Sequence, residues 1–211
     1  MSRSPATYVG ASACTACHVA EVEAWQGSHH DLAMQPVSEQ TVLGDFDDAK
    51  FESAGRITTF FRRDDGWLVN TDGPDGQLAD YAIKYTFGIT PLQQYLVEFP
   101  DGRLQALSIS WDSRPAEQGG QRWFHLYAGQ NVSHDDPLHW TRPSQNWNFM
   151  CAECHSTDLR RNYDAATDRF TTQWSDIDVA CEACHGPASN HLAWAKAAER
   201  QRNADATRGL V

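Results

Sequence analysis

Between residues 44 and 135, hydrophobic and polar positions alternate in short runs, which is the pattern of half-buried β-strands. Turn signals separate the runs, namely Asp64-Asp65-Gly66, Asp75-Gly76 and Asp101-Gly102. The runs are rich in branched and aromatic residues and occupy 56–61, 67–70, 81–87, 95–99 and 104–111. This middle stretch is expected to form an antiparallel meander with a small core of its own.

The segment before residue 44 shows helical spacing instead. Val22 and Trp25 follow His18 by four and seven residues, which places the three on one face of a helix. Ser28-x-x-Asp31 has the form of a capping box. It predicts the start of a second short helix.

The last third of the chain combines a hairpin with a helix. The stretch 161–174, with a turn near 165–168, predicts a second β-hairpin. Pro187 can occupy a first helical turn, and a helix over 189–203 would align His191 with Trp194.

All six cysteines lie in three copies of one pattern, Cys-x-x-Cys-His. The copies are Cys14-Thr15-Ala16-Cys17-His18, Cys151-Ala152-Glu153-Cys154-His155 and Cys181-Glu182-Ala183-Cys184-His185. This is the attachment motif of c-type haem. Residues three and four apart share a helix face, so one turn directs two thiols at the haem vinyl groups and a histidine at the iron. The sequence therefore predicts three covalently bound haem c groups with His18, His155 and His185 as proximal ligands.

Cysteine pairs also bind zinc or act as redox dithiols. Structural zinc sites close with four ligands, and three pairs cannot be divided evenly into four-cysteine sites. With nine histidines in 211 residues, chance rarely places one after each of three pairs. Mixed Cys/His zinc sites stay the main alternative, and no cysteine is left for a disulfide.

The motifs divide the chain unevenly. Segment 1–43 contains the first motif and segment 136–211 contains the other two, with the β-rich stretch 44–135 inserted between them. We expect the two outer segments to form one compact haem-binding unit. The predicted fold class is α+β: short haem-packing helices at both ends, a β-rich middle segment and little regular structure around the haems.

Haem c is attached outside the bacterial cytoplasmic membrane, so the motifs predict an exported, periplasmic or extracellular protein. The chain begins Met-Ser-Arg-Ser-Pro-Ala without the apolar run of a signal peptide, and its targeting segment is therefore expected to be missing. No stretch approaches the roughly 18 consecutive apolar residues of a transmembrane helix. The abrupt end at 208–211 indicates a piece of a longer protein.

Acidic residues outnumber basic ones. The 28 Asp and Glu residues against 17 Lys and Arg residues give a net charge of −11. This balance argues against nucleic acid as a partner, because phosphates attract Lys and Arg. It fits a basic redox partner protein, although the same charge can simply keep the surface solvated.

Several short elements around the motifs resemble a known family. Tyr8-Val9-Gly10 precedes the first motif and Trp25-x-x-Ser28-x-His30-x-x-Ala33 follows it, while the third motif continues with Gly186-Pro187 and Ser189-x-His191. These elements resemble the multihaem cytochromes of the cytochrome c-554 and octahaem reductase type. The likeness covers 8–35 and 147–195 and is greatest to the N-terminal haem region of long multihaem proteins, some ending in tetratricopeptide repeats. Members often carry more than three haems, which again indicates a missing part.

The resemblance implies that His30 and His191 are distal iron ligands, each to a haem other than the nearest in sequence. The residues alone leave more choices. Three six-coordinate haems need three distal ligands, and the six histidines left after the proximal three are His29, His30, His125, His134, His139 and His191.

Each choice has an ordinary structural alternative. His29 and His30 are adjacent, and either can be a polar surface residue. His139, just upstream of the second motif, can fold back onto a haem, whereas His125 lies in a strand-like run and can equally be a buried structural histidine. His134, among serine and aspartate residues, is typical of a surface loop. The third distal ligand stays open between His139 and His125.

Two function classes compete. An electron carrier needs both axial positions of each iron filled, whereas an enzyme needs one open position. Related proteins perform nitrite, hydroxylamine or tetrathionate chemistry at such open sites. Because the spare histidines suffice for full coordination, the sequence favours electron transfer to redox partner proteins or further haem domains. A haem redox enzyme and a haem module of a larger protein are the alternatives.

Overall fold

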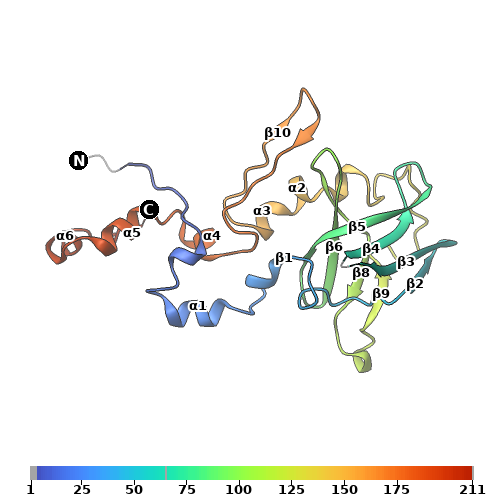
Figure 1. Ribbon diagram of the computed structural model, residues 1–211, viewed down its shortest axis with the longest axis horizontal. Helices are drawn as coiled ribbons and strands as arrows, with labels where there is room; N and C mark the ends of the chain where they lie inside the picture. The colour runs from blue at the N-terminus through green and yellow to red at the C-terminus, as the bar shows by residue number, and fades with distance from the viewer. Residues whose placement is uncertain (1–3, 65, 211) are drawn as a thin grey trace.

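The middle of the chain folds into an antiparallel β-sheet, as its alternating pattern predicts. The computed structural model describes residues 4–64 and 66–210, apart from the side chains of Arg200 and Gln201, so Asp65 of one expected turn lies outside the described residues. Within them the sheet has nine strands (Figure 1): β1 (Met34–Pro36), β2 (Ala49–Ser53), β3 (Arg56–Arg63), β4 (Gly66–Asp72), β5 (Leu78–Phe87), β6 (Leu92–Glu98), β7 (Leu104–Ala106), β8 (Ile109–Asp112) and β9 (Arg122–His125).

The sheet curls around its inner face. Its strands follow the order β2-β3-β4-β5-β6-β8-β9, while β1 pairs with β5 and β7 pairs with β6. Strand β5 is the longest and changes register between Ile83 and Tyr85, where a β-bulge interrupts its pairing with β6. The first strand in this order, β2, contacts the last, β9. The curled sheet therefore encloses a core of its own.

Aromatic side chains fill that inner core. Phe60 of β3 and Trp123 of β9 stack with ring centroids 3.5 Å apart and an angle of 4° between their planes. Phe46 meets each of them edge-on at 5.5 Å. Because aromatic pairs add specific attraction to the burial of apolar area, these contacts hold strands from opposite ends of the sheet together.

The outer face carries α2 (Trp147–Met150) and α3 (Ala152–His155), and the second motif consists of Cys151 and α3. On β6, Leu96 points to this face while its neighbours point to the inner core, as the alternation of a strand requires. Trp147 and Ala152 are fully buried against it. The buried Asn148 side chain accepts a hydrogen bond from Leu104 N (2.8 Å) and donates one to Thr172 Oγ1 (2.8 Å). The second motif is thus mounted on the sheet.

Truncating Trp147 should weaken the packing of the second motif against the sheet. Trp147→Ala is expected to lower the free energy of unfolding by about 3–5 kcal/mol, because a fully buried aromatic side chain leaves a cavity. Phe149→Ala on the same helix is the control, since Phe149 is 50% exposed and should cost about 1 kcal/mol. Denaturant unfolding followed by circular dichroism measures both. Equal losses would contradict the assignment of Trp147 to the core.

The rest of the chain contains only short elements. They are α1 (Val19–Trp25), α4 (Cys181–His185), α5 (Ser189–Lys196), α6 (Glu199–Asn203) and a hairpin of β10 (Tyr163–Asp164) and β11 (Arg169–Phe170). The hairpin predicted over 161–174 is confirmed. In the described part of the chain, no helix combines the length and the apolar surface that crossing a bilayer requires.

The predicted capping box is present, but it starts no further α-helix. Asp31 N donates to Ser28 Oγ (3.4 Å), and Gly27 N donates to Asp31 Oδ2 (2.7 Å). A single 3₁₀ turn, Asp31–Ala33, follows and leads directly into β1.

The prediction of one continuous helix over 189–203 is wrong. Ala197 and Ala198 are extended, with ψ angles of 159° and 149°, and they separate α5 from α6. The Trp194 indole donates to Arg202 O (3.1 Å) across the break. The chain thus folds back over α5, and these tertiary contacts override the helix propensity of its alanines.

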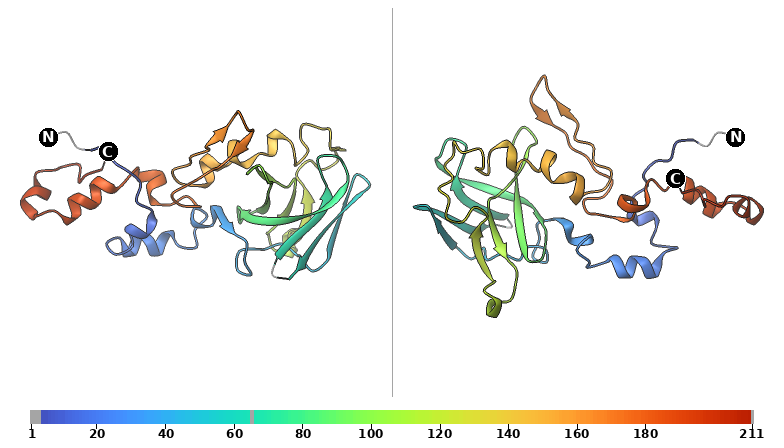
Figure 2. Two further views of the ribbon diagram at one scale, coloured as in Figure 1. Left: turned by 45° about the horizontal axis from the view of Figure 1, so that its top comes forward. Right: turned by 180° about the vertical axis from the view of Figure 1, so that it is seen from behind.

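The first and third motifs share one end of the molecule. Figures 1 and 2 show the sheet at one end, α1, α4, α5 and α6 at the other, and α2 and α3 between them. Backbone bonds tie the N-terminal segment to this end, since Ser189 N donates to Thr7 O (3.1 Å) and Val179 N donates to His30 O (3.2 Å). The α+β class with a β-rich middle is confirmed, while the domain boundaries at 43 and 135 stay a prediction.

Candidate haem sites

Each Cys-x-x-Cys-His motif forms a tight turn. In the first, the N–H groups of Cys17 and His18 donate to Cys14 O at 3.2 and 3.0 Å. In the second, Cys154 N donates to Cys151 O at 3.1 Å, and the third motif is α4 itself. In all three the first cysteine is partly buried and the second is exposed. The three motifs therefore form similar turns, although they lie in different parts of the fold.

Two histidines carry the ring tautomer that suits iron ligation. Nδ1 of His155 lies 3.0 Å from Ala33 O, and Nδ1 of His191 lies 2.8 Å from Arg208 O. A carbonyl oxygen can only accept, so each Nδ1 carries the proton, and Nε2 is the ring nitrogen that could bind iron. Metal-ligating histidines are oriented by bonds of this kind.

The ring of His191 lies close to that of His18, the histidine of the first motif. The ring centroids of His18 and His191 are 6.1 Å apart, with 37° between the planes. Two imidazoles on opposite sides of one metal ion, each bonded at about 2 Å, would have centroids roughly 6 Å apart. Trp194 stacks on His191 at 5.5 Å and 19°. The spacing of the two histidines matches that of two axial ligands to one iron.

The first and third motifs meet at their first cysteines. The pKa of Cys14 is raised to about 11, first by burial, next by the Cys181 thiol, which hydrogen-bonds to it, and then by Glu182 and Asp176. Two thiols that hydrogen-bond are neighbours. The first attachment points of two motifs that are distant in sequence therefore lie side by side.

Hydrogen bonds link the residues just after the second motif to those just before the third. Thr157, two residues after His155, donates through Oγ1 to Asp178 O (2.8 Å) and accepts from Ala180 N (3.0 Å). Burial, and then the nearby carboxylates of Asp31 and Asp176, raises the pKa of Asp178 to about 7. The segment just before the third motif thus contains a buried acidic side chain, Asp178, and is hydrogen-bonded to the segment after the second motif.

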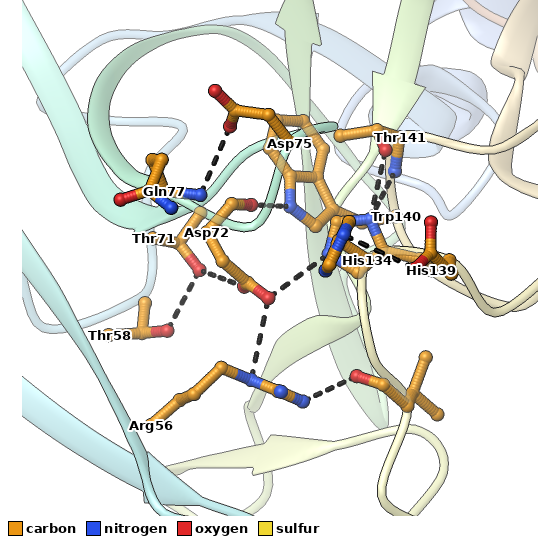
Figure 3. Close-up of polar contacts among 12 residues, drawn as sticks. Arg56, Thr58, Thr71, Asp72, Asp75, Gln77, His134, His139, Trp140 and Thr141 are labelled. Carbon is orange, nitrogen blue, oxygen red and sulfur yellow. Dashed lines mark hydrogen bonds and ion pairs between the residues drawn. The ribbon is translucent and has the colours of Figure 1, made fainter.

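Two of the other predicted ligands lie in the β-sheet unit, that is, strands β1 to β9 and the segment between β9 and α2. His139 is buried there, with Nδ1 2.9 Å from Thr141 Oγ1 and Nε2 3.3 Å from Asp72 Oδ2 (Figure 3). Nδ1 of His125 accepts from Tyr127 N (3.0 Å), and burial lowers the pKa of this histidine. Within the described residues, the hydrogen bonds and ion pairs of these two side chains involve no residue of a Cys-x-x-Cys-His motif.

The remaining histidines that the sequence predicts as ligands are exposed. His29 and His30 follow α1, and the backbone of His30 lies beside Val179, next to the third motif. His185 at the end of α4 is exposed as well. The structure therefore brings His191 to His18, and it brings the backbone of His30 to Val179, two residues before the third motif.

Sequence reasoning missed the groups that orient these ligands. The acceptors for His155 and His191 are the backbone carbonyls of Ala33 and Arg208, for which no sequence signal exists. Glu182 was visible only as a variable position inside the third motif. Its burial and its contacts follow from the tertiary fold.

The donor set fits haem c. Each motif offers two thiols and a histidine on one turn, and His18 has a facing imidazole at ligand spacing. Within residues 4–64 and 66–210, no group of three or more His, Cys, Asp or Glu side chains is arranged to hold a metal ion by itself.

Comparisons with known proteins agree with this chemistry. The sequence model of the family described as "Cytochrome c554 and c-prime" matches residues 13–59 and 128–186. The outer cell wall cytochrome OcwA has a similar fold, with a TM-score of 0.56 and 18% identity over 97% of this chain and 34% of that chain. An undecahaem cytochrome from the S-layer of Carboxydothermus ferrireducens gives a TM-score of 0.50 and 17% identity over 92% of this chain and 22% of that chain. No curated protein matches.

The chain spans about a third of the first structure and about a fifth of the second. The segments matched by the family model make up half of the chain and contain all three motifs, whereas His191 lies outside them. The resemblance inferred from the sequence is confirmed: the chain belongs to the cytochrome c554 and c-prime family and is a multihaem c-type cytochrome.

Proposed function

We propose that this chain is an electron-transfer module that holds three haem c groups through its three motifs. The thiols of Cys14 and Cys17, Cys151 and Cys154, and Cys181 and Cys184 would form the thioethers, with His18, His155 and His185 as proximal ligands. The observation that carries the proposal is the pairing of His18 with His191 at 6.1 Å, because an iron held on both sides has no open position for a substrate. When bound, each haem supplies an iron that accepts and releases one electron.

The chain's own residues would hold the ligands still. The carbonyls of Ala33 and Arg208 fix the rings of His155 and His191 by accepting from Nδ1. His30, whose backbone bonds to Val179 just before the third motif, is the ligand we propose for one of the other two irons, in preference to His29. His125 and His139 would then support the β-sheet unit.

The contacts between motifs support a relay. The first and third motifs meet at the Cys14 and Cys181 thiols, and Thr157 links the second motif to the segment before the third. Each motif is therefore in contact with a segment that carries another.

We place this module in the periplasm or outside the cell. Haem c attachment requires export, and two proteins of similar fold are a cell-wall and an S-layer cytochrome. Because the chain spans only part of each, further haem domains are natural partners. The net charge of −11 favours a redox partner with a basic surface.

Loading the protein with haem tests the proposal. After expression with a haem-attachment system, intact mass should show three haem additions, and absorption spectra should show only low-spin haem in both redox states. The bare polypeptide mass would refute haem attachment. A high-spin component that shifts with nitrite or hydroxylamine would instead support a haem redox enzyme.

A further inference from the structure

Glu182 is a buried carboxylate inside the third haem motif. Its side chain is only 2% exposed. Oε2 accepts from Gly10 N (2.8 Å) and Val9 N (3.0 Å), and Oε1 accepts from Ala188 N (2.8 Å). Its hydrogen-bond partners in the described structure are backbone N–H groups and include no Lys or Arg side chain.

These hydrogen bonds replace the water that a carboxylate binds at the surface. Burying an ionised carboxyl group is costly unless donors replace its water shell, and hydrogen bonds to the charged form favour that form. Gly10 has φ 80°, in the left-handed region that favours glycine, and this conformation lets two successive N–H groups converge on the carboxylate. The Tyr8-Val9-Gly10 element thereby gains a physical role, that of an anion-binding turn.

The three donors come from segments that carry the facing histidines. Val9 and Gly10 precede the first motif, which contains His18. Ala188 precedes the first residue of α5, which contains His191. Glu182 thus forms hydrogen bonds to the segment before His18 and to the segment before His191, the two histidines whose ring centroids are 6.1 Å apart. Thr7 and Ser189 add two further bonds between the same segments, at 2.9 and 3.1 Å.

The charge of Glu182 also reaches the haem attachment points. It lies next to Cys181 in the chain, and it accepts a hydrogen bond from Gly10 N, four residues before Cys14. A fixed negative charge in a medium of low dielectric constant favours the ferric state of a nearby iron over the ferrous state, because the ferric state carries one more positive charge.

We propose that Glu182 is a positioning residue that aligns His191 with His18, and a fixed charge that lowers the reduction potentials of the first and third haems. The inference rests on the proposed electron-transfer function. The carboxylate would keep the anion-binding turn, α4 and the start of α5 in one register, and its charge would stabilise the oxidised state of the two irons beside it.

The test uses the haem-loaded protein and two substitutions of this residue. Glu182→Gln removes the charge and keeps one of the two acceptor oxygens, while its NH₂ group replaces the other. Two of the three midpoint components should therefore shift upward. Glu182→Ala removes both acceptor oxygens, so one haem should also gain a high-spin fraction that is larger than in Glu182→Gln. Redox titration followed by absorption and electron paramagnetic resonance measures both effects.

Glu153→Gln is the matched control. It removes a carboxylate from inside the second motif, but Glu153 is exposed and paired with Arg161 (2.8 Å). Water and the cation already screen its charge, so the midpoints should stay near those of the wild type. Equal shifts in Glu153→Gln and Glu182→Gln would overturn the specific role of Glu182.

Further outcomes decide the two parts of the proposal separately. Unchanged midpoints in Glu182→Gln would overturn the charge effect, and a fully low-spin Glu182→Ala protein would overturn the positioning role. If Glu182→Gln fails to accumulate haem, Glu182→Asp tests the charge effect instead. This variant retains the negative charge, so its midpoints should stay at the wild-type values. An upward shift of its midpoints would count against the proposal. A wild-type protein without three low-spin haems would refute the proposed function itself.

Discussion

Replacing both cysteines of the third motif, Cys181→Ala with Cys184→Ala, is expected to remove one haem and to disturb a second. The directly attached haem is lost because its two thioethers cannot form. The haem of the first motif should gain high-spin character, because α4 carries Glu182 and leads directly into the helix of His191. Intact mass counts the haems, and electron paramagnetic resonance reports the spin state of those that remain.

The physical reason is the thin protein core at this end of the molecule. Helices α1 and α5 contain no buried residue, and the only one in α4 is Glu182. A small unit that buries little apolar surface needs another source of stability. We expect the porphyrins to supply it, so the loss of one should weaken the packing of its neighbour.

The matching double variant in the second motif, Cys151→Ala with Cys154→Ala, is the control. It should also lose one haem, yet leave the first haem low-spin. Its motif is mounted on the sheet through the fully buried Trp147 and Ala152, which need no porphyrin to pack. If both double variants disturbed the first haem equally, the coupling between the first and third motifs would be wrong.

The features predicted correctly from the sequence are local ones. Alternation and turn residues locate the sheet and the 161–174 hairpin, because period-two burial and tight turns are encoded within a few residues. The motifs identify the cofactor for the same reason, since two thiols and a histidine on one turn need no tertiary context. The helix over 189–203 failed where the Trp194 bond to Arg202 O outweighed local propensity.

The distal ligands show where sequence reasoning ends. A histidine that binds iron and one that binds a carboxylate look the same in a sequence. The structure places His139 beside Asp72 and Thr141, in a polar cluster of the β-sheet unit that also includes Arg56 (Figure 3). The partner of His191 is set by how the ends of the chain meet, and neither spacing nor composition encodes that.

The cluster around Asp72 also explains why a histidine is tolerated in an apolar interior. Asp72 lies 3.3 Å from His139 Nε2 and 3.4 Å from Arg56 Nε, and its pKa is held below the usual value chiefly by these two groups, against the opposing effect of burial. Buried polar groups are retained where they find partners of this kind. His139 therefore has a structural role available without iron.

Substituting His191 should have the clearest effect on one haem alone. In His191→Ala the iron bound by His18 would lose its second imidazole, so about a third of the haem should turn high-spin and bind carbon monoxide when reduced. The haem should stay attached, because its thioethers and proximal histidine remain. Its midpoint should rise, since a strong-field ligand that stabilises the ferric state is gone.

His134→Ala is the control for this variant, since His134 lies in a loop of the β-sheet unit with its ring 3.3 Å from Asp135. Its spectra and midpoints should match those of the wild type. Added imidazole should restore the low-spin spectrum of His191→Ala by occupying the opened position, and a rescue of this kind separates lost ligation from general unfolding. A His191→Ala protein that stays low-spin without imidazole would contradict this assignment. It would show that the first iron takes its distal ligand from another residue, and that packing and the hydrogen bond to Arg208 O alone hold the His191 ring beside His18.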